Sequence, residues 1–112
     1  MRLKSEIWVS ALLRRCSTEG KFGAVIHKGA ADAGTIFVCI NHLDGTYDVL
    51  GPPPGPAFDE QGERRFQRES HLPMAWPDVS QWLLKRRKSD PDLWAVEIED
   101  RKGFAGLAPE KL

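Results

Sequence analysis

The stretch Thr35-Ile36-Phe37-Val38-Cys39-Ile40 decides the fold, because so continuous an apolar run predicts a strand that is buried on both faces. Its successive residues point to opposite sides of a sheet, Phe37 and Cys39 to one side and the branched residues between them to the other. The turn signal Asp44-Gly45 follows, and residues 46–50 return as the hairpin partner. A central hairpin whose faces both need cover predicts an α+β domain.

Before this hairpin, the first twenty residues allow two arrangements. We expect residues 6–9 to form a strand, followed by a short helix over residues 11–16 that Ser10 caps. The alternative is one helix over residues 5–19. Its apolar positions would spread around most of the helix circumference, with Arg15 inside the apolar stripe, so the split arrangement is preferred.

The segments on either side of the central hairpin carry weaker signals. Residues 22–28 predict a second strand, and the small side chains of residues 29–34 predict a hairpin connection into the central strand. After the hairpin, Gly51-Pro52-Pro53-Pro54-Gly55-Pro56 predicts a stiff extended connector, because proline cannot donate to a sheet ladder. The alternation over residues 64–68 predicts a short edge strand. We therefore expect residues 51–76 to be an irregular connector.

A second helix is predicted over residues 77–88, where a proline suits the first helical position and apolar residues recur at helical spacing. A turn at residues 90–92 leads to residues 94–99, which alternate as in a half-buried strand. The last dozen residues carry no pattern and are expected to be frayed. These elements predict a single two-layer domain over residues 1–112, with a mostly antiparallel sheet of about five strands and two helices covering one face.

The composition excludes several classes of protein. The chain has 112 residues, enough for one modest core, and its 16 basic residues balance 16 acidic ones. A formal net charge of zero gives no overall attraction to nucleic acid or anionic lipid. The charged start at residues 1–6 precedes no long apolar run, which argues against a membrane span and favours a cytoplasmic protein. In that compartment Cys16 and Cys39 are expected to be free and buried.

Several short motifs point to one family of proteins over nearly the whole chain. These motifs are Arg2-Leu3-Lys4-Ser5-Glu6-Ile7-Trp8-Val9-Ser10-Ala11-Leu12-Leu13-Arg14-Arg15, Ala33-Gly34, Leu50-Gly51-Pro52, Glu63-Arg64-Arg65-Phe66, Asp90-Pro91-Asp92-Leu93-Trp94 and Glu97-Ile98-Glu99-Asp100-Arg101. The chain resembles an uncharacterised domain-of-unknown-function family of short alphaproteobacterial proteins. The resemblance implies a bacterial, cytoplasmic, stand-alone domain, and it brings no catalytic or binding residues to this chain.

One candidate site is a basic surface made by three arginines of the predicted edge strand and four cations that close the second helix. The seven residues are Arg64, Arg65, Arg68, Lys85, Arg86, Arg87 and Lys88. Together they would bind an anion or nucleic acid, with a tryptophan to stack on a base. The alternative is structural, because cations in a last helical turn complement the helix dipole and four in succession point in different directions.

A second candidate is the pair Glu97 and Glu99, whose spacing places both carboxylates on one strand face. About 7 Å separates residues so spaced, which suits general acid–base catalysis or a metal ion. The alternative is an ordinary exposed sheet face. Because His27, His42 and His71 are scattered and none stands at ligand spacing, the sequence predicts no metal, no cofactor and no catalytic residue.

Four tryptophans are many for so short a chain, and a small domain has little interior room for all of them. Because large aromatic side chains at a surface mark interaction sites, we expect Trp76 and Trp82 to form an aromatic interaction patch. The sequence favours a non-catalytic protein-interaction module that binds a protein partner or a second copy of itself. Anion or nucleic-acid binding and a small acid–base or metal-dependent enzyme are the alternatives.

Overall fold

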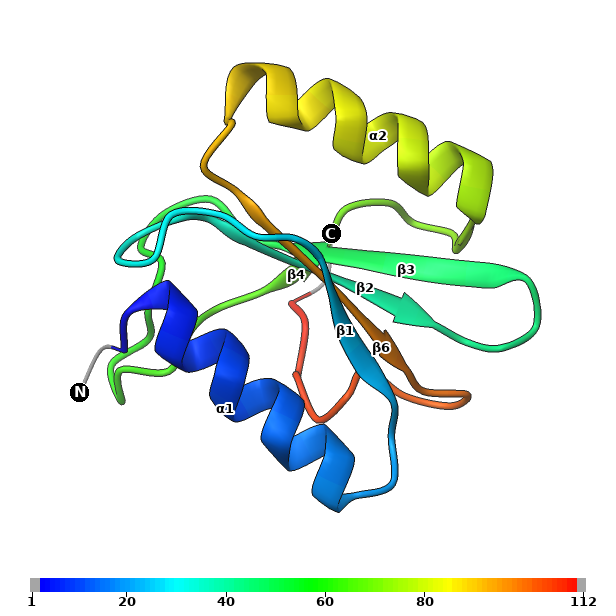
Figure 1. The fold of residues 1–112 in the computed structure, drawn as a ribbon, viewed down its shortest axis with the longest axis horizontal. Helices are drawn as coiled ribbons and strands as arrows, with labels where there is room; N and C mark the ends of the chain where they lie inside the picture. Colours follow the sequence, from blue (N-terminus) through cyan, green and yellow to red (C-terminus); the bar gives the residue numbers. More distant parts are fainter. Residues whose placement is uncertain (1–2, 111–112) are drawn as a thin grey trace.

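The computed structural model of the chain describes residues 3–110. Within that range two helices and six strands follow one another (Figure 1). In order they are α1 (Ser5–Thr18), β1 (Gly23–His27), β2 (Ile36–Asn41), β3 (Thr46–Gly51), β4 (Gln67–Arg68), β5 (Met74–Ala75), α2 (Trp76–Ser89) and β6 (Trp94–Glu99). This content confirms the predicted α+β class, with six strands in place of about five.

All six described strands belong to one mixed sheet, with strand order β1-β6-β2-β3-β4 and with β5 also paired to β3. β2 and β6 run parallel, and the other pairings are antiparallel. β2 is therefore central between β3 and β6, and its residues 36–40 are buried. The predicted central hairpin is confirmed, since Val38 pairs with Leu50 across β2 and β3.

The two helices lie on opposite faces of the sheet, as Figure 1 shows, so the prediction that both cover one face is wrong. On one face, Val9, Leu12 and Cys16 of α1 pack in the core cluster that contains the branched residues of β2. On the other face, Val79 and Leu83 of α2 pack in the core cluster that contains Phe37 and Cys39 of β2. The physical reason is that β2 is apolar on both sides. A layer of helices on one face of the sheet would leave the other apolar face exposed to water.

The preferred split of the first segment into a strand and a short helix is also wrong, because α1 is one continuous helix of 14 residues. Its buried side chains Val9, Leu12 and Cys16 recur at a spacing that places them on one stripe, which is enough to bury the helix. Ile7 is left exposed. Ser10, the predicted cap, is an exposed residue in the middle of the helix.

The predicted hairpin between β1 and β2 does not form, because β6 lies between these two strands. β1 pairs antiparallel with β6, so the connection over residues 29–34 crosses the end of β6 instead of turning back on itself. Gly29 and Gly34 make this crossing feasible. A Cβ atom added at either glycine would collide with the carbonyl oxygen of Asp92.

β6 is buried more completely than its alternating pattern predicts. Trp94, Ala95, Val96 and Ile98 are all buried, because β6 is an interior strand with a helix over each face. The indole nitrogen of Trp94 donates a hydrogen bond of 2.8 Å to the carbonyl oxygen of Ala30. This bond links the connection over residues 29–34 to the sheet. Trp94, Val96 and Ile98 are buried as the alternation predicts, and the prediction of a half-buried strand is wrong only for Ala95.

The rest of the chain is irregular but packed. The predicted edge strand over residues 64–68 is present as the shorter β4, which pairs with β3. Within residues 101–110 the chain folds back on the sheet, with Ala105 fully buried, so this part is not frayed; residues 111–112 lie outside the described range. Neither described helix has the length and apolar character needed to cross a bilayer.

Candidate functional site

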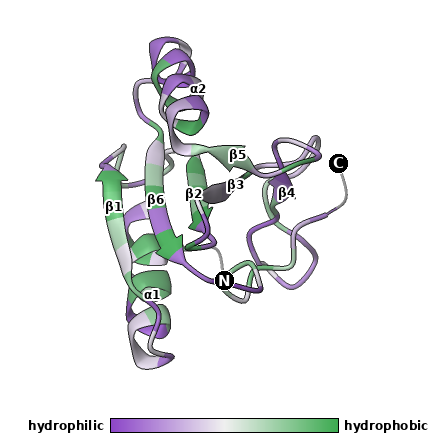
Figure 2. Ribbon diagram, turned by 90° about the vertical axis from the view of Figure 1, so that its right-hand side faces the viewer, coloured by the Kyte–Doolittle hydropathy of each residue, from purple (hydrophilic) through white to green (hydrophobic). Residues whose placement is uncertain are grey.

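Several large exposed apolar residues lie in or next to β1, which forms one edge of the sheet (Figure 2). β1 pairs with β6 on one side, and no other described strand pairs with it on the other side. Phe22 just before the strand is 61% exposed, and Val25 and Ile26 within it are 42% and 40% exposed. An edge of this kind is a template for another strand, because its outward N–H and C=O groups have no ladder partner.

A shallow groove of about 120 Å³ runs beside this edge, between β1 and α2. A bulge between Val25 and His27 adds Ile26 to the strand, and both Ile26 and His27 line the groove. On the helix side the groove is lined by Trp76, 38% exposed, and Leu84, 57% exposed. We call Phe22, Val25, Ile26, Trp76 and Leu84 the β1–α2 surface.

The two tryptophans predicted to form one aromatic patch occupy different environments. Trp76 packs on Tyr47, with 5.2 Å between ring centroids, and stays open to the groove. Trp82 packs edge-on against Phe37, with centroids 5.1 Å apart, and covers the core on the α2 face. Only Trp76 belongs to the β1–α2 surface. The other two tryptophans are internal, since Trp94 is buried and Trp8 is half-buried against Phe66.

The three predicted basic residues before and within β4 each have a separate role in the fold. Arg65 donates from Nε and Nη2 to the carboxylate of Glu110 over 2.8 and 2.9 Å. Arg68 donates to the carboxylate of Asp48. Arg64 lies over two aromatic rings and has no carboxylate partner among the described residues.

The four cations at the end of α2 are exposed and lie on the other face of the sheet from α1. Arg86 lies over the rings of Trp82 and Phe37, at 5.7 and 5.4 Å from their centroids. Lys85, Arg87 and Lys88 form no ion pair with any described residue. Arg64, in contrast, packs on Trp8 of α1, so the structure does not bring it to the cations of α2.

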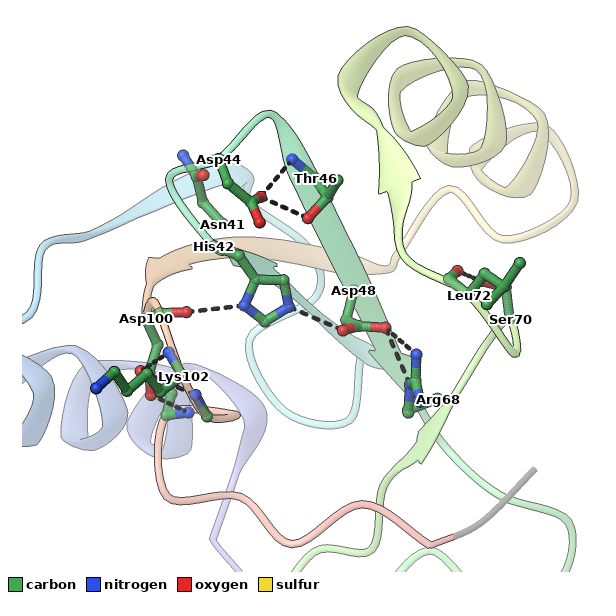
Figure 3. A network of polar contacts seen from close by, with 12 residues as sticks. Asn41, His42, Asp44, Thr46, Asp48, Arg68, Ser70, Leu72, Asp100 and Lys102 are labelled. Carbon is green, nitrogen blue, oxygen red and sulfur yellow. Dashed lines mark hydrogen bonds and ion pairs between the residues drawn. The ribbon is translucent and has the colours of Figure 1, made fainter.

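A buried polar network that the sequence patterns did not reveal joins β3, β4 and the chain after β6 (Figure 3). At its centre Asp48, 4% exposed, accepts from Arg68 on one side and lies 2.8 Å from Nε2 of His42 on the other. The other ring nitrogen of His42, Nδ1, lies 2.8 Å from the carbonyl oxygen of Asp100. The only sequence signal was the position of His42 and Asp48 on either side of the Asp44-Gly45 turn.

The contacts of the His42 ring favour its protonated form. Both neighbours of the ring are acceptors, a carboxylate and a backbone carbonyl, so both contacts are hydrogen bonds only when each ring nitrogen carries a proton. Burial lowers the pKa of His42, but the hydrogen bonds to Asp48 and Asp100, together with the charges of Asp48 and Asp44, raise it, and the net pKa lies above the ordinary value. Asp48 is thus held between two cations.

The predicted carboxylate pair lies on the α2 face of β6. Glu97 and Glu99 pair with Cys39 and Asn41 of β2, so both side chains point to the same side. Asn41 donates from Nδ2 to Glu97 over 3.1 Å. Burial raises the pKa of Tyr47, and the nearby charges of the two glutamates raise it further.

The described residues contain no group of three or more His, Cys, Asp or Glu side chains placed to hold a metal ion. Cys16 and Cys39 are free and buried, as predicted. They belong to the clusters on opposite faces of the sheet. Burial raises the pKa of Cys39 to about 12, which leaves its thiol without nucleophilic character at neutral pH.

These features define a small α+β domain with a central mixed sheet, a helix on each face and an apolar free edge. Over residues 3–108 the sequence matches the model of DUF1491, described as a protein of unknown function. The chain belongs to this family, which confirms the resemblance drawn from its motifs. No curated protein matches the chain.

Solved structures of bacterial proteins share the fold over nearly their whole lengths. The solution structure of protein Atu0922 from A. tumefaciens, a structural genomics target, is 40% identical, with a TM-score of 0.80, and covers 98% of each chain. The crystal structure of a DUF1491 family protein from Caulobacter crescentus is 32% identical, with a TM-score of 0.78, and covers 98% of this chain and 99% of that one. An NMR structure of a DUF1491 family protein from the same organism gives 33% identity and a TM-score of 0.75, covering 100% of this chain and 98% of that one.

Proposed function

We propose that this protein is a non-catalytic protein-interaction module that binds a second copy of itself through the free edge of β1. The observation that carries the proposal is a sheet edge bordered by large exposed apolar side chains. Sheet edges in isolated proteins are usually protected by charges, proline or a covering segment. The strand itself, Gly23-Ala24-Val25-Ile26-His27, contains no lysine, acidic residue or proline. Pairing with another strand would satisfy the outward backbone groups and bury the apolar side chains at once.

A second copy fits this edge because antiparallel pairing about a two-fold axis presents the same strand to itself. In a pair centred on Val25, Lys28 of one copy would lie opposite Phe22 of the other, so no like charges oppose each other. Lys21, just before the strand, is paired with Glu19 of its own chain at 3.5 Å. The charge pattern therefore permits self-pairing and does not specify an oppositely charged partner.

The groove beside the edge adds to the same interface. Trp76 and Leu84 continue the apolar surface from the strand onto α2. A side chain that points toward α2 from the added strand would lie over this groove, because successive residues of a strand alternate between the two faces. A tryptophan within such a groove is the type of residue that dominates the energy of many interfaces.

Sedimentation velocity of the purified protein over a range of concentrations tests this proposal. We expect a reversible dimer for the natural sequence and a monomer for Ile26→Lys, which places a charge on the pairing edge. The matched control is Leu72→Lys, because Leu72 is 75% exposed but lies outside the β1–α2 surface. Amide hydrogen exchange of β1 gives an independent measure, since pairing should slow the exchange of its outward N–H groups. A monomer at every concentration, or a dimer that Ile26→Lys leaves intact, contradicts the proposal.

Nucleic-acid or anion binding by the end of α2 is the second candidate, favoured by the exposure of four successive cations there. Its test is a titration with RNA or DNA at several salt concentrations. Binding should weaken steeply as salt rises, and charge reversal at Arg86 and Arg87 should reduce it. Salt-independent binding, or binding that the double variant preserves, would reject this candidate.

We propose a cytoplasmic location for the module. The support is the pair of buried, unbridged cysteines, since thiols persist in a reducing compartment. The paired carboxylates Glu97 and Glu99 do not suggest a catalytic site to us, because Glu97 accepts a hydrogen bond from Asn41 and the described residues offer no metal cluster beside it.

A further inference from the structure

A cavity of about 410 Å³ opens between the start of α1, the connection before β2 and the segment that follows the proline run. These three parts of the chain lie close together on one side of the molecule (Figure 1). The volume falls within the range of small-molecule sites in proteins. Much of its wall is apolar and comes from Ile36, Pro52, Phe58 and Phe66.

Arg64 is the unusual member of this wall. Its guanidinium lies over the ring of Phe58 at 4.9 Å and the ring of Trp8 at 5.6 Å, which hold its plane in place. Its Nε atom is buried and has no hydrogen-bond acceptor among residues 3–110. Burial lowers the pKa of Arg64, and no carboxylate offsets that shift. The aromatic rings attract the face of the guanidinium, but they do not supply acceptors for the N–H groups along its edge.

The other charges at the cavity are already engaged. Lys4 and Asp32 form an exposed ion pair at 3.6 Å. Arg65 uses its fork on Glu110 and also donates to the carbonyl oxygens of Pro54 and Pro56. Among residues 3–110, the cavity lining carries three cations and one carboxylate, and Arg64 is the cation whose buried Nε atom has no acceptor.

We propose that this cavity binds a small organic carboxylate whose apolar body lies against Phe58 and Phe66 while its carboxylate pairs with the guanidinium of Arg64. A carboxylate matches the planar fork of arginine with two hydrogen bonds and supplies the missing opposite charge. The apolar wall selects a ligand with a hydrophobic body over a bare anion such as phosphate. This site is separate from the β1–α2 surface, so the inference stands independently of the proposed self-association.

Titration of the whole protein with benzoate, followed by ¹H–¹⁵N NMR, tests the inference. We expect saturable shifts of the Arg64 Nε–Hε signal and of the backbone amides of Ile36 and Phe66. Benzamide, which is neutral and of nearly the same shape, and inorganic phosphate, which lacks an apolar body, should each bind at least about tenfold more weakly.

Three variants distinguish binding at this cavity from non-specific binding elsewhere on the protein. Arg64→Met should weaken benzoate binding by about tenfold or more, whereas Arg101→Met, an exposed arginine after β6, should leave it unchanged. Ala33→Leu narrows the cavity without touching Arg64 and should also weaken binding, which keeps the inference testable if Arg64→Met does not fold. Equal binding of benzoate and benzamide, benzoate binding that survives Arg64→Met, or binding of phosphate alone would overturn the inference.

Discussion

At the scale of single residues, the buried carboxylate of Asp48 is the centre of the polar network between β3, β4 and the chain after β6. It lies between the guanidinium of Arg68 and the imidazolium of His42, and it links β3 to β4 and to the chain after β6. Its two partners lie where the sheet pairing is short or has ended. Arg68 belongs to the two-residue strand β4, and His42 follows the end of β2. The network therefore holds in place parts of the chain that the sheet alone does not secure.

Replacing Asp48 with alanine should lower the free energy of unfolding by about 3 kcal/mol, because the half-buried side chains of His42 and Arg68 would be left without their anion. Asp44→Ala is the control. That carboxylate is exposed and its hydrogen bonds lie within its own turn, so its loss should lower the free energy of unfolding much less. Urea unfolding followed by circular dichroism measures both values. Similar losses for the two variants would show that the network contributes little.

The charge on His42 makes stability depend on pH. Its pKa in the folded protein lies above that of the unfolded chain, so the folded state holds the proton more tightly. The stabilisation is fully present below the unfolded pKa of about 6.5 and is lost as pH rises through the folded pKa. We expect the free energy of unfolding to fall over that window in the natural protein and to change less in His42→Gln. Parallel pH profiles for the two proteins, measured by urea unfolding, would contradict this assignment.

At the scale of elements, α1 is a continuous helix because one buried stripe is sufficient, even though exposed apolar residues such as Ile7 blur its pattern. Ser10 distinguishes this helix from the alternative in which a strand precedes a shorter helix. In the continuous helix Ser10 is an interior position, whereas in the split arrangement it would be a cap.

Ser10→Pro should therefore lower the free energy of unfolding by about 3 kcal/mol, since proline within a helix removes a hydrogen bond and clashes with the preceding turn. Ser10→Ala should be neutral or slightly stabilising, because alanine favours a helix interior and replaces an exposed side chain. Thermal unfolding of the two variants gives the comparison. A larger loss for alanine than for proline would instead indicate a capping role.

The two tryptophans of α2 should separate stability from association. Trp82→Ala removes the ring that packs on Phe37 and should cost about 2 kcal/mol of stability, with little effect on dimerisation. Trp76→Ala should weaken dimerisation measured by sedimentation and cost less stability, because Trp76 is open to the groove. The reverse assignment of the two effects would contradict the role of Trp76 in the proposed interface.

At the scale of the whole molecule, the distribution of charge and apolar surface determines how the proposed self-association should respond to salt. The net charge is zero, and the exposed apolar residues of the β1–α2 surface border a strand without acidic residues or lysine. Association through such a surface depends on the burial of apolar side chains and on backbone hydrogen bonds between strands. Dissolved salt does not screen either of these interactions.

The dimerisation constant should therefore stay nearly constant, or increase slightly, as sodium chloride is raised from low to high concentration. Nucleic-acid binding by α2 should instead weaken steeply over the same range. Sedimentation equilibrium at several salt concentrations measures the first quantity. A dimer that dissociates with added salt would point to an interface made by charges elsewhere on the surface.

The central hairpin, the edge strand β4 and the second helix were all predictable from local patterns. Each is specified by neighbouring residues, such as the apolar run from Ile36 to Ile40 and the turn at Asp44-Gly45. The patterns also predicted one aromatic patch of Trp76 and Trp82, but they did not reveal that the two side chains lie in different environments. The cavity at Arg64 and the network at Asp48 escaped prediction, because their members come from segments far apart in the chain.

The sequence by itself determined the α+β class, the family and the presence of a strand that is apolar on both sides. These properties depend on residue types and on the order of neighbouring residues in the chain. Only the tertiary structure decided that β6 lies between β1 and β2, that the helices lie on opposite faces and that β1 is left as a free edge. The physical reason is that strand order depends on which distant surfaces bury each other best, a property of pairs of segments that no single segment encodes.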